Sequence, residues 1–283
     1  RYVLRYLVNN WLFSGNYVGP VKEVLAPQAG RQRRALELGT RTGTWIQSMA
    51  TEFPHVQFHT LDVVPIMAHA PRANITFEVY DFTEGILLED GSQDVVFLNM
   101  VMEMVKDYRG LIREVYRVLR PGGVIHTCDY IPFLWDSQNP AIPAERINPA
   151  ASRIVSHSLE LLAKIGIDPE TCNKLPKWLA PESDIWDNNM DERRGFEQIQ
   201  LVVRTHPAYP HPGSPCSNRL DGRIGPYLGY LTVMLVRDLF GVLKDKGMEE
   251  EEVKKLIEDM IDELKRHDKC ALLKLSCVYA TKI

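Results

Sequence analysis

The sequence predicts an α/β fold in which parallel strands alternate with crossover helices. Short apolar runs of strand length alternate with helical repeats through the first half of the chain, the rhythm typical of such a sheet. One well-marked helix is followed by Pro121-Gly122-Gly123 and then by another apolar run. The composition, 45% hydrophobic and 25% charged over 283 residues, is that of a globular chain able to bury a sizeable core.

Five apolar runs are the predicted strands of the first half: Arg34–Leu38, Val56–Leu61, Ile75–Val79, Asp94–Met100 and Val124–Cys128. Asp107 is the predicted N-cap of the clearest helix, in which apolar side chains repeat at helical spacing from Tyr108 to Leu119. Pro121-Gly122-Gly123 is expected to end that helix and turn the chain into the next strand.

The pattern changes between residues 131 and 194, where prolines and tryptophans are scattered and only Ser152–Ile165 has a helical pattern. We expect this segment to be an insertion packed over one end of the sheet, because bulky aromatic side chains need a surface to bury against. A strand at Phe196–Val203 and a rigid proline-rich loop at Thr205–Gly213 follow. Two helices, Tyr227–Leu243 and one with an apolar stripe from Val253 to Leu264, precede a closing strand at Leu272–Tyr279.

Charge and composition exclude several partners. The net charge of −4 lacks the basic footprint of a nucleic-acid-binding protein. No membrane segment is expected, since the apolar stretch Val95–Val105 is interrupted by Asn99 and Glu103 and is far shorter than the ~20 residues of a spanning helix. No N-terminal signal segment is expected either.

Five cysteines form no C-x-x-C pair, so neither a disulfide framework nor a zinc site is indicated. All five are expected to be reduced, and no metal site is predicted. A reducing compartment favours a cytoplasmic location, with the nucleus as the alternative.

The residues that carry chemistry follow the predicted strands. Glu37 ends the first strand and is followed by a turn that contains Gly39 and Gly43; in open α/β sheets, ligands bind beyond such strand ends. Asp62 ends the second strand and can accept two hydrogen bonds from a ribose diol. Asp81, after the third strand, can bind an exocyclic amine, and Phe82 beside it can cover a base.

These residues and three further phrases resemble the class I S-adenosylmethionine-dependent methyltransferases, and in particular the LaeA-like methyltransferases of fungal secondary metabolism. The phrases are Phe53–Pro65, Val105–Tyr108 and Val118–Gly123. The resemblance is strong over Ala35–Tyr130. It continues weakly to the C-terminus.

The resemblance implies a Rossmann-like seven-stranded sheet of order 3-2-1-4-5-7-6 with the last strand antiparallel, helices on both faces and a cap insertion. Four segments follow: a helical lid (1–33), the cofactor-binding core (34–130), the cap (131–194) and the C-terminal completion of the same sheet (195–283). This division favours a single domain.

The resemblance also implies S-adenosylmethionine as cofactor, with S-adenosylhomocysteine as product, and it assigns residues to this cofactor. Glu37 is expected to orient its methionine end, Asp62 to hold the ribose and Asp81 the adenine amine. The remaining expected contacts of the cofactor are Gly39, Thr40, Gly43, Val63, Phe82, Asn99 and Met100.

Arg41 departs from the family pattern, which has a central glycine in this turn. Its side chain either clashes with the methionine moiety, points to solvent at an ordinary φ, or pairs with the cofactor's carboxylate. We expect cofactor binding to survive in a weakened form.

Candidate catalytic residues are His206, His211 and Tyr130. A histidine titrates near neutrality and can act as a general base, although two surface histidines in a turn is the alternative interpretation. The expected contacts of the acceptor are Tyr6, Trp11, Tyr17, Glu103 and Trp135. Their aromatic character favours an apolar or aromatic acceptor. The N-terminal aromatics fit either a lid or a helix packed on the core, and Glu103 fits a helix cap equally well.

The sequence therefore predicts a methyltransferase acting on O, N or S of a small fungal metabolite. Two alternatives remain open: a catalytically weak or inactive LaeA-like regulatory protein that binds a protein partner, and a protein methyltransferase. Arg41 and the lack of a clear base favour the regulatory alternative, whereas Glu37, Gly39, Gly43, Asp62 and Asp81 favour the enzyme.

Overall fold

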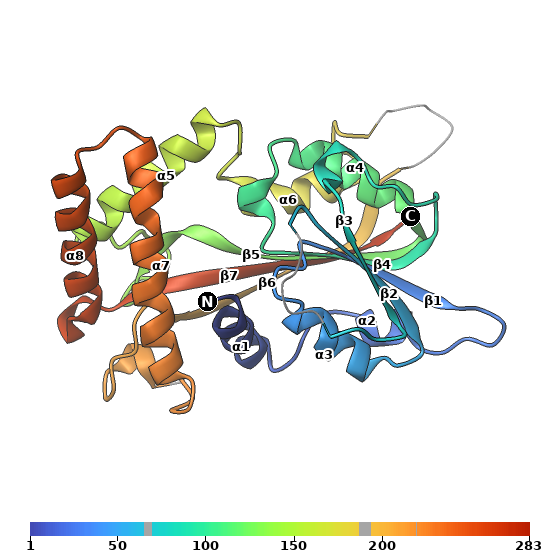
Figure 1. The fold of residues 1–283 in the computed structure, drawn as a ribbon, viewed down its shortest axis with the longest axis horizontal. Coiled ribbons are helices and arrows are strands. Elements are labelled where there is room, and N and C mark those ends of the chain that lie inside the picture. The colour runs from blue at the N-terminus through green and yellow to red at the C-terminus, as the bar shows by residue number, and fades with distance from the viewer. Residues whose placement is uncertain (65–69, 187–193, 219) are drawn as a thin grey trace. The chain divides into compact units, whose positions relative to one another are not determined.

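Seven strands form one mixed sheet of order β3-β2-β1-β4-β5-β7-β6, the order that the resemblance implies (Figure 1). The computed structural model describes residues 1–64, 70–186, 194–218 and 220–283; Pro65, which closes one of the motifs above, lies outside them. The strands are β1 (Arg33–Leu38), β2 (Val56–Asp62), β3 (Ile75–Val79), β4 (Gln93–Asn99), β5 (Leu119–Asp136), β6 (Phe196–Pro207) and β7 (Ala271–Lys282). The predicted α/β fold class is confirmed.

The first five strands pair in parallel, and their register aligns their carboxyl ends. Glu37 on β1 pairs with Thr60 on β2 and with Phe97 on β4, while Asn99 at the end of β4 pairs with Cys128 on β5. The helices are α1 (Tyr2–Phe13), α2 (Val21–Val24), α3 (Thr44–Glu52), α4 (Tyr108–Val118), α5 (Pro149–Lys164), α6 (Thr171–Leu179), α7 (Gly225–Asp245) and α8 (Glu250–Lys265), and the short 3₁₀ turns are η1 (Phe82–Glu84), η2 (Met102–Met104), η3 (Pro215–Ser217) and η4 (His267–Lys269).

Helix α4 begins as predicted, but the Pro-Gly-Gly segment does not end it. Asp107 Oδ1 accepts a hydrogen bond from Gly110 N at 2.7 Å and caps the helix. Leu119 is already extended, and β5 starts there, so Pro121-Gly122-Gly123 lies inside the strand. The pairing of β5 with β4 shifts register at this point, and Gly122 takes a φ of +73°. A β-bulge accommodates a segment that the sequence alone reads as a turn.

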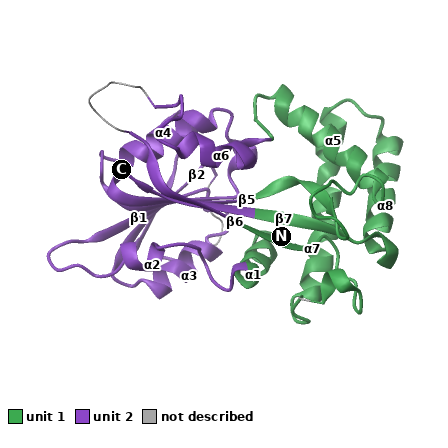
Figure 2. Cartoon of the chain, turned by 180° about the vertical axis from the view of Figure 1, so that it is seen from behind, with its two compact units in different colours: residues 1–12, 130–169, 203–275 green, residues 13–129, 170–202, 276–283 purple. Residues whose placement is uncertain are grey.

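The chain divides into two compact units (Figure 2). Unit 1 consists of Arg1–Leu12, Tyr130–Pro169 and Val203–Leu275, and unit 2 of Phe13–Asp129, Glu170–Val202 and Ser276–Ile283. Strands β5, β6 and β7 each contribute residues to both units. The predicted core (34–130) lies in unit 2 except for Tyr130, whereas the other three predicted segments contribute residues to both units.

The core of unit 2 lies between α2, α3 and one face of the sheet. Side chains of β1, β2 and β4 alternate between the two faces of the sheet, and those on one face pack against the apolar face of α3. The buried members of this cluster are Val21, Leu25, Ala35, Ile46, Met49, Ala50, Phe53, Val56, Phe58, Val95, Phe97 and Val124.

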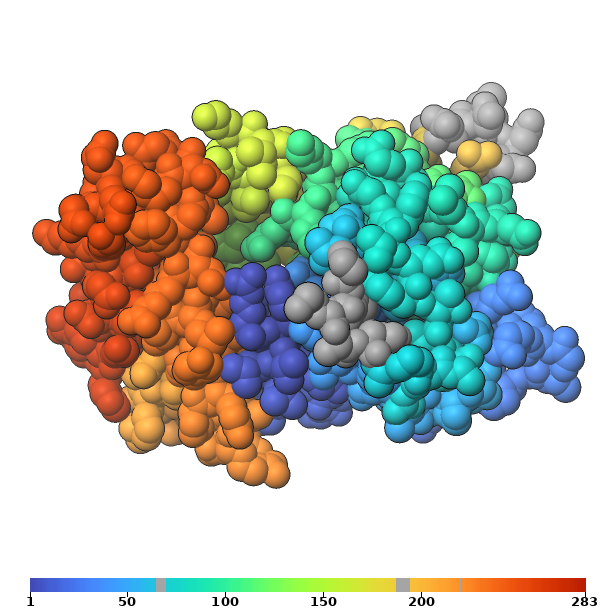
Figure 3. All heavy atoms as spheres, viewed as in Figure 1, coloured from blue at the N-terminus to red at the C-terminus, as the bar shows by residue number. Residues whose placement is uncertain are grey.

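The core of unit 1 is helical, with α8 packed against α5 and α7 (Figures 1 and 3). The six apolar positions of the predicted α8 stripe, from Val253 to Leu264, are all buried. Helix α1 packs on α7 within the same unit through Val8, Leu228 and Leu231. This packing supports the interpretation of the N-terminal segment as a helix on the core.

The expectation that no segment is long and apolar enough to span a membrane does not take helix α7 into account. Its 21 residues reach that length and hydropathy, whereas the stretch Val95–Val105 does not. The core helix of a soluble protein meets the same requirement, and α7 packs on α8 through buried residues such as Val236 and Leu243.

The expectation of five reduced cysteines is wrong for four of them. Cys128 on β5 is joined to Cys277 on β7 within unit 2, and Cys216 is joined to Cys270 within unit 1. The paired residues are 149 and 54 positions apart in the sequence, so only the tertiary fold brings them together. Cys172 is buried and lies outside both disulfides.

A buried carboxylate ties three strands of unit 2 together at their amino ends. Asp94, 1% exposed at the start of β4, accepts hydrogen bonds from Arg33 Nη1 at 2.8 Å and from Arg34 N at 2.9 Å on β1. It also pairs with Arg120 on β5 and, at 3.1 Å, with Arg31. The charge of Asp94 is thus compensated by three guanidinium groups, as a buried charge requires.

We predict that Asp94→Asn lowers the free energy of unfolding by about 3–5 kcal/mol, because it leaves the guanidinium groups of Arg33 and Arg120 uncompensated. Urea unfolding followed by tryptophan fluorescence measures this loss. Asp90→Asn is the matched control: Asp90 also pairs with an arginine, Arg117, but it is exposed, so the loss should stay below about 1 kcal/mol. Equal losses in the two variants would contradict the role given to Asp94.

Candidate active site

The carboxyl ends of β1, β2 and β4 bring together three of the predicted residues. Glu37 lies one residue before the end of β1, Asp62 closes β2 and Asn99 closes β4. Because the strands are neighbours in parallel register, these side chains share one edge of the sheet in unit 2.

Glu37 is a buried carboxyl group with a neutral partner. It is 2% exposed, and Thr60 Oγ1 donates a hydrogen bond to its Oε2 at 2.6 Å. Burial raises the pKa of Glu37 to about 8, with Asp62 adding to the shift and Thr60 and Arg41 opposing it. Glu37 is therefore mostly protonated near neutral pH in the structure described.

The turn after β1 depends on glycine at two positions. Gly39 has a φ of +83°, and a Cβ added there would lie 2.6 Å from Val101 Cγ1. Gly43 has a φ of +71° and is the N-cap of α3. Between them, Thr40 is buried. Its hydroxyl is hydrogen-bonded to Thr60 Oγ1 and lies 3.3 Å from Leu61 O.

Arg41 does not point to solvent at an ordinary φ, which was one of the three alternatives. Its φ is +57°, a left-handed conformation that favours glycine, as the family pattern has. Its backbone N–H donates to Asp62 Oδ2 at 2.7 Å. The guanidinium donates to Met100 O and lies 3.7 Å from Met104 Sδ. The side chain therefore links the turn after β1 to the end of β4, instead of pointing to solvent.

Asp62 is held in place by backbone groups on both oxygens. Besides Arg41 N, Val64 N donates to Oδ1 at 3.2 Å, and the side chain is 2% exposed. A carboxylate has about four acceptor sites, so these bonds leave capacity for a diol. Val63 beside it is exposed.

Asp81 and Phe82, which follow β3, differ in their exposure to solvent. Asp81 is exposed and its Oδ1 accepts from Thr83 N at 3.0 Å and from Thr83 Oγ1 at 2.7 Å, which caps the short turn η1. Phe82 is fully buried, so its ring has no exposed face on which an adenine could stack in this conformation.

Two unusual features lie at the end of β4, at the same edge of the sheet as Glu37 and Asp62. Asn99 Nδ2 is a buried donor without a hydrogen-bond partner among the described residues. Met100 has a φ of +59°, unusual for a residue other than glycine, and its N–H donates to Cys128 O at 2.8 Å. A buried donor without a partner indicates a place for an external acceptor.

Other predicted contacts in unit 2 are peripheral to these strand ends. Tyr17 donates its hydroxyl hydrogen to Glu52 Oε1 at 2.7 Å, and its ring packs against Phe53 beside the α3 core. Glu103 is exposed on η2. Asp129, not Glu103, caps η2 by accepting from Met102 N at 3.2 Å.

Two of the three candidate catalytic residues form a pair within unit 1. Tyr130 Oη lies 3.1 Å from His206 Nε2 and 3.0 Å from Asn9 Oδ1. His206 is 3% exposed, and burial lowers its pKa to about 4. Its Nδ1 lies 2.9 Å from Pro207 O, so Nδ1 carries the hydrogen and Nε2 is the basic nitrogen.

His211 does not belong to that pair. It is buried, with Nε2 2.8 Å from Leu264 O and Nδ1 3.8 Å from Cys216 Sγ, so it is not the surface histidine of the alternative interpretation. Elsewhere in unit 1, Trp135 is half-buried under Lys274 Nζ, which lies 3.3 Å from its ring centroid, and Tyr6 and Trp11 are half-buried on α1.

The sequence interpretation missed the partner of Glu37 and the contact made by Arg41. Thr60 is two residues before Asp62, and alternation along β2 predicts that it points to the same face. No sequence signal indicates the contact of Arg41 with Met100, which is 59 residues away.

The arrangement can bind a ligand that carries both a cation and a diol. A buried carboxyl group can ionise against a cationic group, Asp62 can accept from hydroxyls and Asn99 Nδ2 can donate to an acceptor. A nucleoside that carries an amino acid side chain has these groups, and the residues that would bind them all lie on one sheet edge.

Comparison with known proteins agrees with this chemistry. The sequence profile of the methyltransferase domain family matches residues 15–164. The secondary metabolism regulator laeA of Coprinopsis cinerea is 27% identical over 96% of this chain and 64% of its own length. Methyltransferase pytC of Aspergillus terreus is 26% identical over 55% of this chain and 47% of its own length. The chain thus spans less than two thirds of either relative.

Among solved structures, the [4+2]-cyclase SpnF matches 99% of this chain and 93% of its own, with 12% identity and a TM-score of 0.45. Phosphoethanolamine N-methyltransferase 2 of Haemonchus contortus, in complex with S-adenosyl-L-methionine, matches 98% of this chain and 56% of its own, with 18% identity and a TM-score of 0.44. Since the profile covers more than half of the sequence, the chain belongs to the methyltransferase domain family.

Proposed function

We propose that this protein transfers a methyl group from S-adenosylmethionine, the cofactor of its family, to an O, N or S atom of a small metabolite. The observation that carries the proposal is the set of Glu37, Asp62 and Asn99 at the aligned ends of three neighbouring parallel strands. The fungal relatives laeA and pytC support an acceptor from secondary metabolism.

The residues of unit 2 fit this cofactor chemically. Glu37 would face the ammonium of the methionine end, Asp62 the ribose hydroxyls, and Asn99 Nδ2 an acceptor atom, which would satisfy its buried hydrogens. Gly39 and Gly43 allow the backbone to approach a ligand closely. The Arg41 side chain has to break its hydrogen bond to Met100 O if a ligand is to occupy the space that this side chain fills.

When bound, S-adenosylmethionine supplies a methyl group activated on a sulfonium. The protein then contributes alignment of the acceptor and exclusion of water, which alone can lower the barrier greatly for an acceptor that is already nucleophilic. Fixed donors and acceptors at the strand ends need no reorganisation during transfer.

A protonated acceptor would require a base, and His206 is our candidate. Burial lowers the pKa of His206 to about 4, so its imidazole is neutral at neutral pH but is a weak base, and Tyr130 Oη lies 3.1 Å from its Nε2. The aromatic residues Tyr6, Trp11 and Trp135 remain candidates for an apolar acceptor. A cytoplasmic or nuclear location is part of the proposal.

Arg41 favours a second candidate function, that of a regulatory protein with weak or no turnover. A side chain fixed across two strand ends opposes a ligand there, and laeA, which matches 96% of this chain, is a secondary metabolism regulator. Such a protein would act through a protein partner.

Transfer of labelled methyl from S-adenosylmethionine to a panel of phenols, thiols and amines tests the activity. We expect label in at least one acceptor, and a loss of about a hundredfold in Asp62→Ala, since a carboxylate with two charge-assisted bonds contributes about 3 kcal/mol. Glu84→Gln, an exposed acid on η1, is the control and should keep full activity. Cofactor binding without label in any acceptor would favour the regulatory candidate.

The affinity for S-adenosylhomocysteine should depend on pH through Glu37. Its folded-state pKa of about 8 means that the carboxylate needed for an ammonium is lost as the pH falls through that value. We expect the dissociation constant to rise about tenfold from pH 7 to pH 6, by calorimetry. Glu37→Gln should bind weakly with no such slope; a native profile that is flat from pH 6 to pH 8 would contradict the role of Glu37.

Arg41→Gly should tighten S-adenosylhomocysteine binding about tenfold, the equivalent of releasing one charge-assisted hydrogen bond. The same calorimetry on Gln198→Gly provides the control, because Gln198 also has a positive φ (51°) but lies on β6. Weaker binding by Arg41→Gly would instead show that the guanidinium pairs with the cofactor's carboxylate. No binding at all by the native chain, restored by glycine, would refute the expectation that binding survives.

A further inference from the structure

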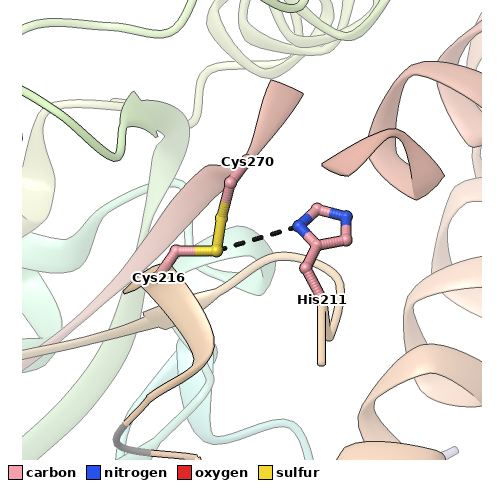
Figure 4. Close-up of side chains that lie close together, drawn as sticks. All are labelled: His211, Cys216 and Cys270. Atoms are coloured by element: carbon pink, nitrogen blue, oxygen red, sulfur yellow. Dashed lines mark hydrogen bonds between the residues drawn. A yellow bond between two sulfur atoms is a disulfide. The ribbon is translucent and has the colours of Figure 1, made fainter. Parts of the chain in front are cut away.

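Unit 1 contains a cluster of metal-ligating side chains that the methyl-transfer chemistry does not use. His211, Cys216 and Cys270 present one ligand atom each, and all three atoms lie within 4.8 Å of one another (Figure 4). His211 and Cys216 flank the loop that ends in η3, and Cys270 directly precedes β7. No metal site is expected from the sequence, because the five cysteines form no C-x-x-C pair.

The orientation of His211 is that of a metal ligand. Its Nε2 lies 2.8 Å from Leu264 O at the end of α8, so Nε2 carries the hydrogen and donates to that carbonyl. Its Nδ1 is therefore the basic nitrogen, and it points at Cys216 Sγ at 3.8 Å (Figure 4). Metal-bound histidines are typically fixed in this way, with the second ring nitrogen donating to a carbonyl or carboxylate.

The surroundings suit a buried dication. His211 is 1% exposed and Cys270 is 7% exposed. The ring centroid of His267 lies 5.2 Å from that of His211.

We propose that His211, Cys216 and Cys270 form a binding site for a zinc-type divalent ion when the two cysteines are reduced. Two thiolates neutralise the charge of the ion, so the bound site is uncharged and tolerates burial. The Nδ1–Sγ distance of 3.8 Å is close to the ~3.6 Å that tetrahedral zinc with ordinary bond lengths requires.

In the structure described the two sulfurs are joined as a disulfide, which cannot supply thiolates. A dithiol reductant breaks the S–S bond, is itself oxidised to a disulfide, and leaves two cysteine thiols. Each thiol releases one proton when it binds the ion. The bound ion and the disulfide thus exclude each other at this position.

The disulfide and the bound ion would each connect the same two segments of unit 1. Cys216 belongs to η3, ahead of α7, and Cys270 lies between η4 and β7. An ion bound by His211 as well would join these two segments to the end of α8 through Leu264. Zinc should therefore replace the stabilisation lost when the disulfide is reduced.

Co²⁺ titration of the full chain, reduced with a dithiol that is then removed under anaerobic conditions, tests the proposal. We expect one equivalent of Co²⁺ to give the absorption of tetrahedral thiolate-bound cobalt, and one equivalent of Zn²⁺ to displace it. The same chain with its disulfides intact should give no such absorption, and this comparison involves no substitution that might affect folding. Zn²⁺ should raise the Tm of the reduced chain only.

Three variants assign the ligands. Cys270→Ser and His211→Ala should each weaken Co²⁺ binding at least a hundredfold, whereas Cys172→Ser removes a buried thiol outside the cluster and should bind like the native chain. Absence of thiolate-bound cobalt in the reduced native chain would overturn the proposal. So would binding that persists in Cys270→Ser and His211→Ala or is lost in Cys172→Ser.

Discussion

The compensation of the buried Asp94 carboxylate holds the parallel sheet of unit 2 in its register. Arginines from β1 and β5 reach this carboxylate on β4, so three adjacent strands are fixed to one another at their amino ends. Since strands of a parallel sheet keep the same rise, fixing the amino ends also fixes where the carboxyl ends lie. Glu37 and Asn99 reach one edge because of this alignment, and the parallel pairing of β2 with β1 brings Asp62 to the same edge.

The sequence predicted the repeating elements well and the long-range contacts poorly. The bounds of β3 were predicted to the residue, and the whole apolar stripe of α8 is buried, because periodicity records which side faces a core. Pro121-Gly122-Gly123 was misread because a bulge in β5 and a turn place the same demands on the backbone. The cysteine pairs join residues far apart in the sequence, which no local pattern encodes.

In the candidate site too, the residue types could be predicted from the sequence but the long-range contacts could not. The types of residue at Glu37, Gly39, Gly43 and Asp62 follow from the strand–turn–helix pattern, and the structure places all of them at the strand ends. The conformation of Arg41 could not be predicted, because it depends on Met100, which follows β4 and itself has a positive φ. Two such residues on neighbouring strand ends indicate that the edge is held in one particular conformation.

The polar groups of this edge largely satisfy one another in the structure described. Thr60 donates to Glu37, the backbone of Arg41 donates to Asp62, and its guanidinium donates to Met100 O. A ligand gains affinity here only from the bonds that exceed those it displaces. Asn99 Nδ2, which lacks a partner among the described residues, is where a new bond displaces nothing. We therefore expect the net affinity to depend on Arg41: its release from Met100 O would open the edge, and its retention there would weaken cofactor binding.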